Sequence, residues 1–131
     1  MIKKTIWVVD DDPIYQIIIN KIIQKSDIFS SNYSFTNGKE ALNALKNALV
    51  DNNSLPDIIL LDINMPVMDG WQFIEELKNI KSKINKQITT YIVSSSIAIE
   101  DMDKSKKIDA IFGYIPKPVS MEDLLSIVTN S

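Results

Sequence analysis

The sequence predicts an α/β fold, a doubly wound five-stranded parallel sheet with helices on both faces. Short apolar segments rich in β-forming residues alternate five times with longer segments of helical periodicity. The 131 residues suit a single domain, which we place at residues 1–131, since no repeat or linker interrupts them. Acidic and hydroxyl side chains directly follow several apolar segments, as expected where strands end at a ligand site.

The first strand and helix are predicted from residues 5–25. Thr5–Val9 is apolar and β-rich, which indicates a buried strand. Asp12 suits the N-cap and Pro13 the first position of the following helix. On a helical wheel of Ile14–Lys25, one arc is expected to face the core: Tyr15, Ile18, Ile19, Ile22 and Ile23. The opposite arc is expected to face solvent: Gln16, Asn20, Lys21, Gln24 and Lys25, with Ile14 and Ile17 among them.

The next elements are a short strand, a helix and a second strongly apolar strand. Tyr33–Thr36 predicts the short strand, and Asn37-Gly38 predicts a turn. An apolar stripe then predicts a helix: Ala41, Leu42, Leu45, Ala48 and Leu49. After a polar loop at residues 51–56, Asp57–Leu61 predicts a buried strand that ends at Asp62.

The C-terminal half continues the alternation. A loop up to Gly70 leads to a third helix, marked by Phe73, Ile74, Leu77 and Ile80. Strand Thr89–Val93 precedes three serines, a weak polar helix is expected over Ile97–Lys107, and Phe112–Ile115 predicts the last strand. Ser120 and Asp123 have the spacing of a capping box. The final helix is expected to bury Met121, Leu124, Leu125 and Val128.

Missing residue types exclude several kinds of chemistry. The chain has no cysteine, which excludes disulfides, thiol catalysis and zinc–thiolate sites. It has no histidine, which excludes a Ser-His-Asp triad and a phosphohistidine within the chain. All 14 basic residues are lysines, so bidentate arginine contacts to phosphate or guanine are excluded. With a net charge of -3, this composition argues against a nucleic-acid partner.

The sequence also bears on location. The longest apolar runs, such as Ile58–Leu61, are far too short to span a bilayer. The N-terminus has no signal-peptide pattern. We therefore expect a cytoplasmic, monomeric protein without a membrane partner.

Charged and hydroxyl residues fall at the carboxyl ends of four predicted strands. Asp10 and Asp11 follow the first strand, Asp62 the third, Ser94 the fourth and Lys117 the fifth. In an open parallel sheet, ligands bind beyond these strand ends, where the strand order reverses. The sequence therefore places three carboxylates, one hydroxyl and one ammonium group in one site.

Three carboxylates in one site require a proton or a cation. Two like charges ~4 Å apart repel by about 4 kcal/mol at an effective dielectric constant of 20. An all-oxygen ligand set selects a hard cation, with Mg²⁺ ahead of Mn²⁺ or Ca²⁺. Mg²⁺ keeps several waters, which leaves room for a phosphate oxygen, and an aspartate can itself act as a nucleophile toward phosphorus. The predicted site suits phosphoryl transfer.

Four segments together resemble the receiver domains of two-component response regulators. They are VVDDDP at Val8–Pro13, LLDINMPVMDG at Leu60–Gly70, IVSSS at Ile92–Ser96 and GYIPKP at Gly113–Pro118. Their order and spacing match across essentially the whole chain. The resemblance implies a flavodoxin-like three-layer sandwich with strand order 2-1-3-4-5.

The resemblance also implies roles for individual residues. Asp62 would accept a phosphoryl group from a sensor histidine kinase or a histidine phosphotransfer protein. Asp11, Asp62 and the backbone carbonyl of Asn64 would bind Mg²⁺ directly, and Asp10 mainly through metal-bound water. Three further side chains would contact phosphate or respond to it: Ser94, Lys117 and Tyr114. The Lys117–Pro118 peptide bond would be cis, which aims the lysine inward.

Two apolar residues on the polar face of the first helix suggest a docking surface. Ile14 and Ile17 lie in its first turns, near Asp11. A histidine donor must approach this end of the sheet, so an apolar patch there has a partner to meet. In receiver families this helix docks on the helical bundle of kinases or phosphotransfer proteins. The downstream target is not indicated by the sequence.

Two other functions remain open at this point. Asp10-x-Asp12 after an apolar strand resembles the nucleophile motif of haloacid-dehalogenase-type phosphatases, although that family would not need the motif around Asp62. A receiver-like interaction module that never takes phosphate is the other alternative, although such modules usually lose an acid or the lysine.

Asn64 and Ser96 are neither acidic nor basic, so slow spontaneous dephosphorylation is expected from the resemblance.

Overall fold

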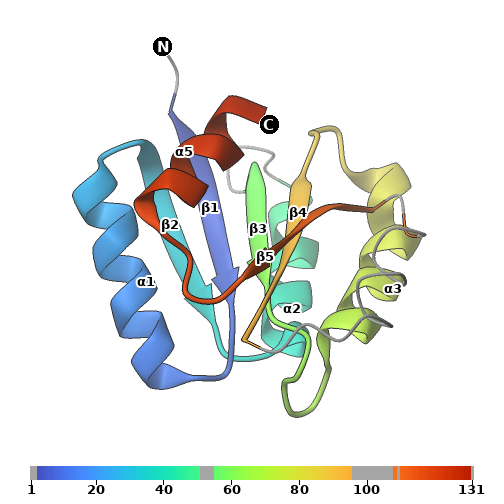
Figure 1. The fold of residues 1–131 in the computed structure, drawn as a ribbon. Helices are drawn as coiled ribbons and strands as arrows, with labels where there is room; N and C mark the ends of the chain where they lie inside the picture. The colour runs from blue at the N-terminus through green and yellow to red at the C-terminus, as the bar shows by residue number, and fades with distance from the viewer. Residues whose placement is uncertain (1–2, 51–54, 96–107, 109, 131) are drawn as a thin grey trace.

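A computed structural model confirms the predicted α/β fold and strand order. It describes residues 3–50, 55–95, 108 and 110–130. The five strands form one parallel sheet in the order β2-β1-β3-β4-β5 (Figure 1). The elements are β1 (Lys4–Val9), α1 (Pro13–Ser26), β2 (Phe29–Phe35), α2 (Gly38–Ala48), β3 (Ile58–Leu61), α3 (Gly70–Ile80), a short 3₁₀ turn (Lys81–Lys83), β4 (Thr89–Ser94), β5 (Ile111–Pro116) and α5 (Met121–Asn130). The helix expected over Ile97–Lys107 and the residue Ser96 lie outside the described residues.

The sheet separates two apolar cores. Alternate residues of a strand point to opposite faces, so Ile6 and Val8 of β1 enter one core while Trp7 and Val9 enter the other. The first core contains buried side chains of α1 and α5, and the second contains those of α2 and α3. Figure 1 shows α1 and α5 on one side of the sheet and α2 and α3 on the other. These two helical layers shield the central strands β1 and β3 from solvent.

Side-chain caps fix where the helices begin. Asp12 accepts hydrogen bonds from the backbone N–H groups of Ile14 and Tyr15, as predicted for the N-cap of α1. Ser120 and Asp123 form the predicted capping box before α5. Asn37-Gly38 was predicted to form a turn, but it begins α2 instead. The Asn37 side chain caps the helix, and Gly38 is the first helical residue.

Two predicted helix faces are partly wrong. In α1, Ile18 is 48% exposed, whereas Gln16 is buried because its amide donates hydrogen bonds to backbone carbonyls at the ends of β1 and β2. In α5, Leu124 and Ile127 are buried, whereas the other predicted core residues are more exposed: Met121, Leu125 and Val128. Val119 enters this core just before α5, so the helix buries a stripe rotated from the predicted one.

Strand β2 begins earlier than predicted, at Phe29 rather than Tyr33. Its seven residues are mostly polar, and they pair with β1 along most of its length. Backbone pairing with β1 therefore determines this edge strand more than its own apolar pattern does. Within the described residues, the helices are all too short or too polar to cross a bilayer.

Candidate functional site

Backbone hydrogen bonds align the strand ends that carry the candidate residues. The N–H of Asp62 donates to the Val9 carbonyl at 2.9 Å, so the end of β3 lies beside the end of β1. The N–H of Lys117 donates to the Ser94 carbonyl at 3.0 Å, which does the same for β5 and β4. The sheet register thus brings the predicted residues to one edge.

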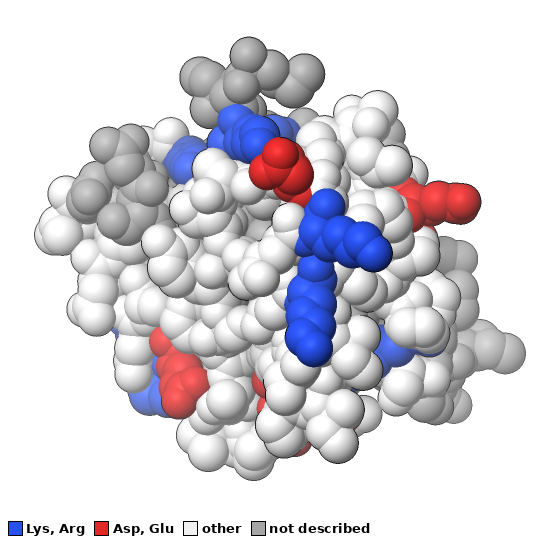
Figure 2. Space-filling view, turned by 90° about the vertical axis from the view of Figure 1, so that its left-hand side faces the viewer, with Lys and Arg blue, Asp and Glu red and all other residues white. Residues whose placement is uncertain are grey.

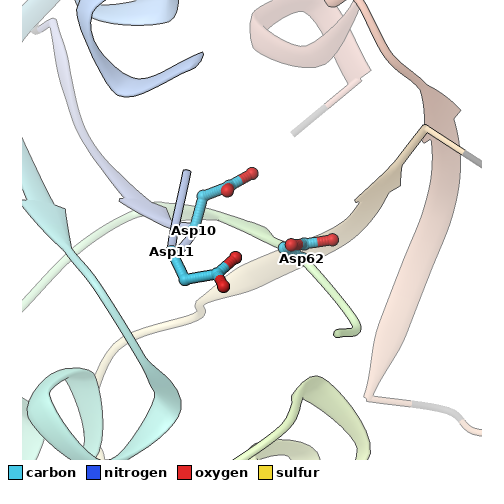
Figure 3. Close-up of side chains that lie close together, drawn as sticks. All are labelled: Asp10, Asp11 and Asp62. Carbon is cyan, nitrogen blue, oxygen red and sulfur yellow. The ribbon is translucent and has the colours of Figure 1, made fainter. Parts of the chain in front are cut away.

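Three carboxylates converge at this edge. Asp10, Asp11 and Asp62 each offer a carboxylate oxygen, and these oxygens lie within 4.8 Å of one another. Figure 3 shows Asp10 and Asp11 at the end of β1 facing Asp62 across the edge of the sheet. Asp10 is 2% exposed and Asp62 is 7% exposed, whereas Asp11 is open to solvent. A ligand can therefore approach from the Asp11 side.

One ammonium group partly neutralises this cluster. The Nζ atom of Lys117 lies 2.6 Å from Oδ2 of Asp10 and 3.9 Å from Oδ2 of Asp62. The Lys117–Pro118 peptide bond is cis, the form that the resemblance implies. Lys117 therefore makes its closest ion pair with Asp10 and a longer one with Asp62.

Asp62 is a poorly stabilised carboxylate. Burial raises its pKa to about 6, with a further contribution from Asp10. The ammonium of Lys117 and the N–H of Ile63, which donates to Oδ1 at 2.9 Å, act in the opposite direction without cancelling the effect. One lysine facing three acids leaves a net negative charge at the site.

The residues present fit a hard divalent cation. The donor atoms are carboxylate oxygens, two of the carboxylates are buried, and the site has excess negative charge. Thiolate and imidazole ligands are excluded because the chain has no cysteine or histidine. Asn64, whose backbone carbonyl the resemblance implies as a ligand, lies exposed in the loop two residues beyond Asp62.

The remaining predicted residues lie on β4 and β5. Ser94 is buried at the end of β4. Tyr114 is half-buried on β5, pairs in register with Ile92 and packs against the α2–α3 core. Ser94 is thus level with Lys117 at the site, whereas Tyr114 lies further back along the sheet.

The loop after Asp62 approaches α3 closely at a glycine. The N–H of Gly70 donates to the Ile63 carbonyl at 2.8 Å. A Cβ atom at Gly70 would lie 2.5 Å from the backbone oxygen of Asp62. Only glycine therefore fits where α3 begins against the backbone of Asp62.

Two residues at the site were missed as functional candidates. Gln16 donates through Nε2 to the Asp10 carbonyl at 2.9 Å and to the Phe35 carbonyl at 3.1 Å, and so braces the backbone of Asp10. Tyr15, predicted only as a core residue, places its ring under the Lys117 ammonium at 4.3 Å from the ring centroid. Burial, then Asp10 and Asp62, raises the pKa of the Tyr15 phenol, which therefore stays neutral. No sequence pattern distinguishes Gln16 from its solvent-facing neighbours.

Ile14 and Ile17 are exposed, as the helical wheel predicted, at 68% and 57%. Ile18 joins them, and we call these three residues the isoleucine patch. The patch lies in the first turns of α1, directly after the Asp10–Asp12 segment. Figure 2 views the side of the molecule that carries α1 and β2, and shows lysines from the upper part of the face to the right of its centre, with acidic side chains beside the upper lysines, at the right edge and at the lower left.

Comparison with known proteins identifies the family. The sequence matches the family "Response regulator receiver domain" over residues 6–129. The DNA-binding transcriptional regulator NtrC of Proteus hauseri is 28% identical over 133 residues, which span the whole chain and 25% of that protein. The sensor histidine kinase CheAY of Helicobacter pylori is 32% identical over 124 residues, covering 94% of this chain and 14% of that protein. The chain thus spans about a quarter or less of the length of these curated relatives.

Solved structures agree in fold over the full length. The crystal structure of a two-component response regulator from Cytophaga hutchinsonii has a TM-score of 0.85 and 28% sequence identity. That match covers 99% of this chain and 97% of the other. With the family match, the strand order and the acidic cluster in agreement, this chain belongs to the response regulator receiver domain family.

Proposed function

We propose that residues 1–131 form one receiver domain that acts as a phospho-acceptor switch, with Asp62 as the acceptor. The observation that carries this proposal is the placement of Asp62. Its carboxylate is buried among the acid cluster, 3.9 Å from Lys117, and has an elevated pKa. A carboxylate that lacks full neutralisation is stabilised when a cation enters the site, and the cation also offsets the negative charge of an incoming phosphoryl group.

The transfer step uses a phosphohistidine on a kinase or a phosphotransfer protein as donor. A carboxylate oxygen of Asp62 attacks phosphorus, an O–P bond forms and the P–N bond to the donor imidazole breaks. The bonding electron pair leaves with the imidazole nitrogen, so the product is an acyl phosphate on Asp62. Lys117 then pairs with a phosphoryl oxygen, and the Ser94 hydroxyl donates to another. The domain catalyses no turnover beyond its own phosphorylation and slow dephosphorylation.

Mg²⁺ is the metal that we assign to the acid cluster. Asp11, Asp62 and the Asn64 carbonyl would hold it directly, and Asp10 through water. When bound, the ion would neutralise charge on the acids and on the phosphoryl oxygens. Asp11 is the exposed member of the cluster, so its removal is expected to abolish metal-dependent phosphorylation while the fold persists.

The output of the switch is a changed surface around β5 and α5. Phosphorylation would draw the Ser94 hydroxyl toward the phosphoryl group, and Tyr114 would then turn further into the sheet. Tyr114 is half-buried here, so it has accessible surface still to lose. The expected partner is a downstream protein rather than nucleic acid, since the chain has no arginine and is mildly acidic. We assign the domain to the cytoplasm, as a monomer.

The isoleucine patch is the surface that we assign to the phosphohistidine donor. It is apolar, exposed and next in sequence to the acids that the donor must reach. The test replaces Ile14 and Ile17 singly with lysine and compares labelling by acetyl phosphate with labelling by a histidine kinase. Docking predicts near-normal labelling by the small donor and a large loss with the kinase. Equal labelling by both donors would contradict it.

The experiment that tests the proposed function is intact-mass spectrometry after acetyl phosphate and Mg²⁺. The wild-type chain is expected to gain one phosphoryl group, and the gain is expected to vanish in Asp62→Asn and on chelation of the metal. Steady turnover of a phosphate ester would instead favour the phosphatase alternative. An unmodified wild-type chain would favour a pure interaction module.

A further inference from the structure

The Lys117 ammonium group has a third neighbour besides the two acids. Its Nζ atom lies over the ring of Tyr15, 4.3 Å from the centroid. Its side chain is 14% exposed, so its contacts are made largely away from water. Cation–π attraction is stronger when the cation is desolvated. The ring of Tyr15 therefore contributes to holding the largely buried ammonium group of Lys117.

A phosphoryl group on Asp62 is expected to draw this ammonium group away from Asp10. In the structure it is closest to Asp10, at 2.6 Å, and 3.9 Å from the Asp62 oxygen. A closer pairing with a phosphoryl group on Asp62 would lengthen the Asp10 contact and shift the ammonium group toward β3. The energy of an ion pair falls as its charges separate. The attraction between Lys117 and Asp10 therefore weakens before the attraction to the phosphoryl group reaches its full strength.

The ring of Tyr15 suits this movement because its attraction is broad. A cation is attracted anywhere over the ring face within about 6 Å of the centroid. At 4.3 Å, Lys117 lies well inside this range, so the attraction persists through a small movement of the ammonium group. We propose that Tyr15 is a positioning residue, whose ring carries the Lys117 ammonium as it passes from Asp10 to the phosphoryl group on Asp62.

Tyr15 is held firmly enough to serve as such a platform. It is the third residue of α1, and its N–H donates to the Asp12 cap at 3.2 Å. Its side chain is buried in the α1–α5 core with Ile19 and Val119. Its hydroxyl is buried without a hydrogen-bond partner among the described residues. The ring of Tyr15, and not its hydroxyl, therefore makes the contact with Lys117.

This inference rests on the proposed function of the same site, and its test separates the two. The variants are Tyr15→Phe, which keeps the ring, and Tyr15→Leu, which replaces it with an aliphatic group. Both are made in the wild-type and Lys117→Met backgrounds. Tyr33→Leu, at an exposed tyrosine on β2, is the control for general effects of losing an aromatic ring.

The first readout is the initial rate of phosphorylation by acetyl phosphate at saturating Mg²⁺. Tyr15→Phe is expected to stay within about 2-fold of wild type, and Tyr15→Leu to slow the reaction by about 5- to 30-fold. In the Lys117→Met background, Tyr15→Leu is expected to have little further effect, because the cation that the ring carries is absent. A purely structural role would slow both backgrounds equally, and that result would overturn the proposal.

The second readout does not depend on phosphorylation. Urea midpoints are compared for wild type, Tyr15→Leu, Lys117→Met and the double variant. The two substitutions are expected to be non-additive, since Tyr15→Leu removes a contact to Lys117 only where Lys117 is present. Additive midpoints would overturn the Tyr15–Lys117 interaction. If the wild type takes no phosphoryl group but the midpoints are non-additive, the proposed function fails while the ring–ammonium contact stands, and the carrying role fails with the function. Equal rates in Tyr15→Leu and wild type would overturn the carrying role alone.

Discussion

Replacing Asp62 with asparagine is expected to stabilise the metal-free protein at neutral and alkaline pH. The carboxylate is buried, and its pKa is raised from 3.8 to about 6. Asparagine keeps the size and can still accept the hydrogen bond that the Ile63 N–H donates, but it carries no charge. The substitution therefore removes the cost of ionising Asp62 in the folded state.

The magnitude follows from the two pKa values. Below pH 3.8 the carboxyl is protonated in both the folded and the unfolded state, so charge contributes little. As pH rises from 3.8 to 6, the unfolded chain loses the proton while the folded chain retains it, and stability falls. Above pH 6 both states are ionised and the cost reaches its full value, about 3 kcal/mol at 1.36 kcal/mol per pKa unit. Asp62→Asn is thus expected to gain about 0.5 kcal/mol at pH 4 and about 3 kcal/mol at pH 8.

Urea denaturation at pH 4, 6 and 8 with a chelator measures this gain as a difference in the free energy of unfolding. Asp69→Asn is the matched control, because asparagine caps a helix as well as aspartate and Asp69, the N-cap of α3, is not a member of the acid cluster. Adding Mg²⁺ is expected to raise the stability of the wild type and to leave Asp62→Asn nearly unchanged. An Asp62→Asn gain that is the same at pH 4 and pH 8 would refute the reasoning.

Three further substitutions test the geometry. Lys117→Met leaves Asp10 buried without its close cation and is expected to cost about 3 kcal/mol in metal-free urea denaturation, with part recovered on adding Mg²⁺. Gly70→Ala forces a Cβ against the Asp62 backbone and is expected to cost about 2 kcal/mol and to slow phosphorylation; an unchanged melting temperature would contradict the close approach. Thr90→Val replaces a fully buried hydroxyl that has no partner among the described residues, and calorimetry is expected to record a gain of about 1 kcal/mol.

Structural features that depend on residues adjacent in the chain, such as helix starts and strand ends, could be predicted from the sequence. The Asp12 cap with Pro13 fixed the start of α1, and the acids at the ends of β1 and β3 were assigned to one edge because parallel strands share their direction. Such features depend on a few adjacent residues and on a general rule of sheet topology.

Features that depend on tertiary partners could not be read in this way. A helical wheel assigns Gln16 to solvent and Ile18 to the core, because it cannot detect the carbonyls at the ends of β1 and β2 that Gln16 satisfies. The closer approach of Lys117 to Asp10 than to Asp62 likewise depends on side-chain geometry that spacing alone does not determine. The edge strand β2 follows the same rule, since pairing with β1 sets its length.

The division of the interior by the sheet has a consequence for how the protein tolerates change. Substitutions on opposite sides, such as Ile19 in the α1–α5 core and Phe73 in the α2–α3 core, share no cluster of side chains, so their effects on stability are expected to add. The layer beneath the isoleucine patch can then be altered during divergence without repacking the layer beneath α2 and α3. A chain built this way can vary the half of its interior beneath α1 and α5 while the opposite half stays as it is.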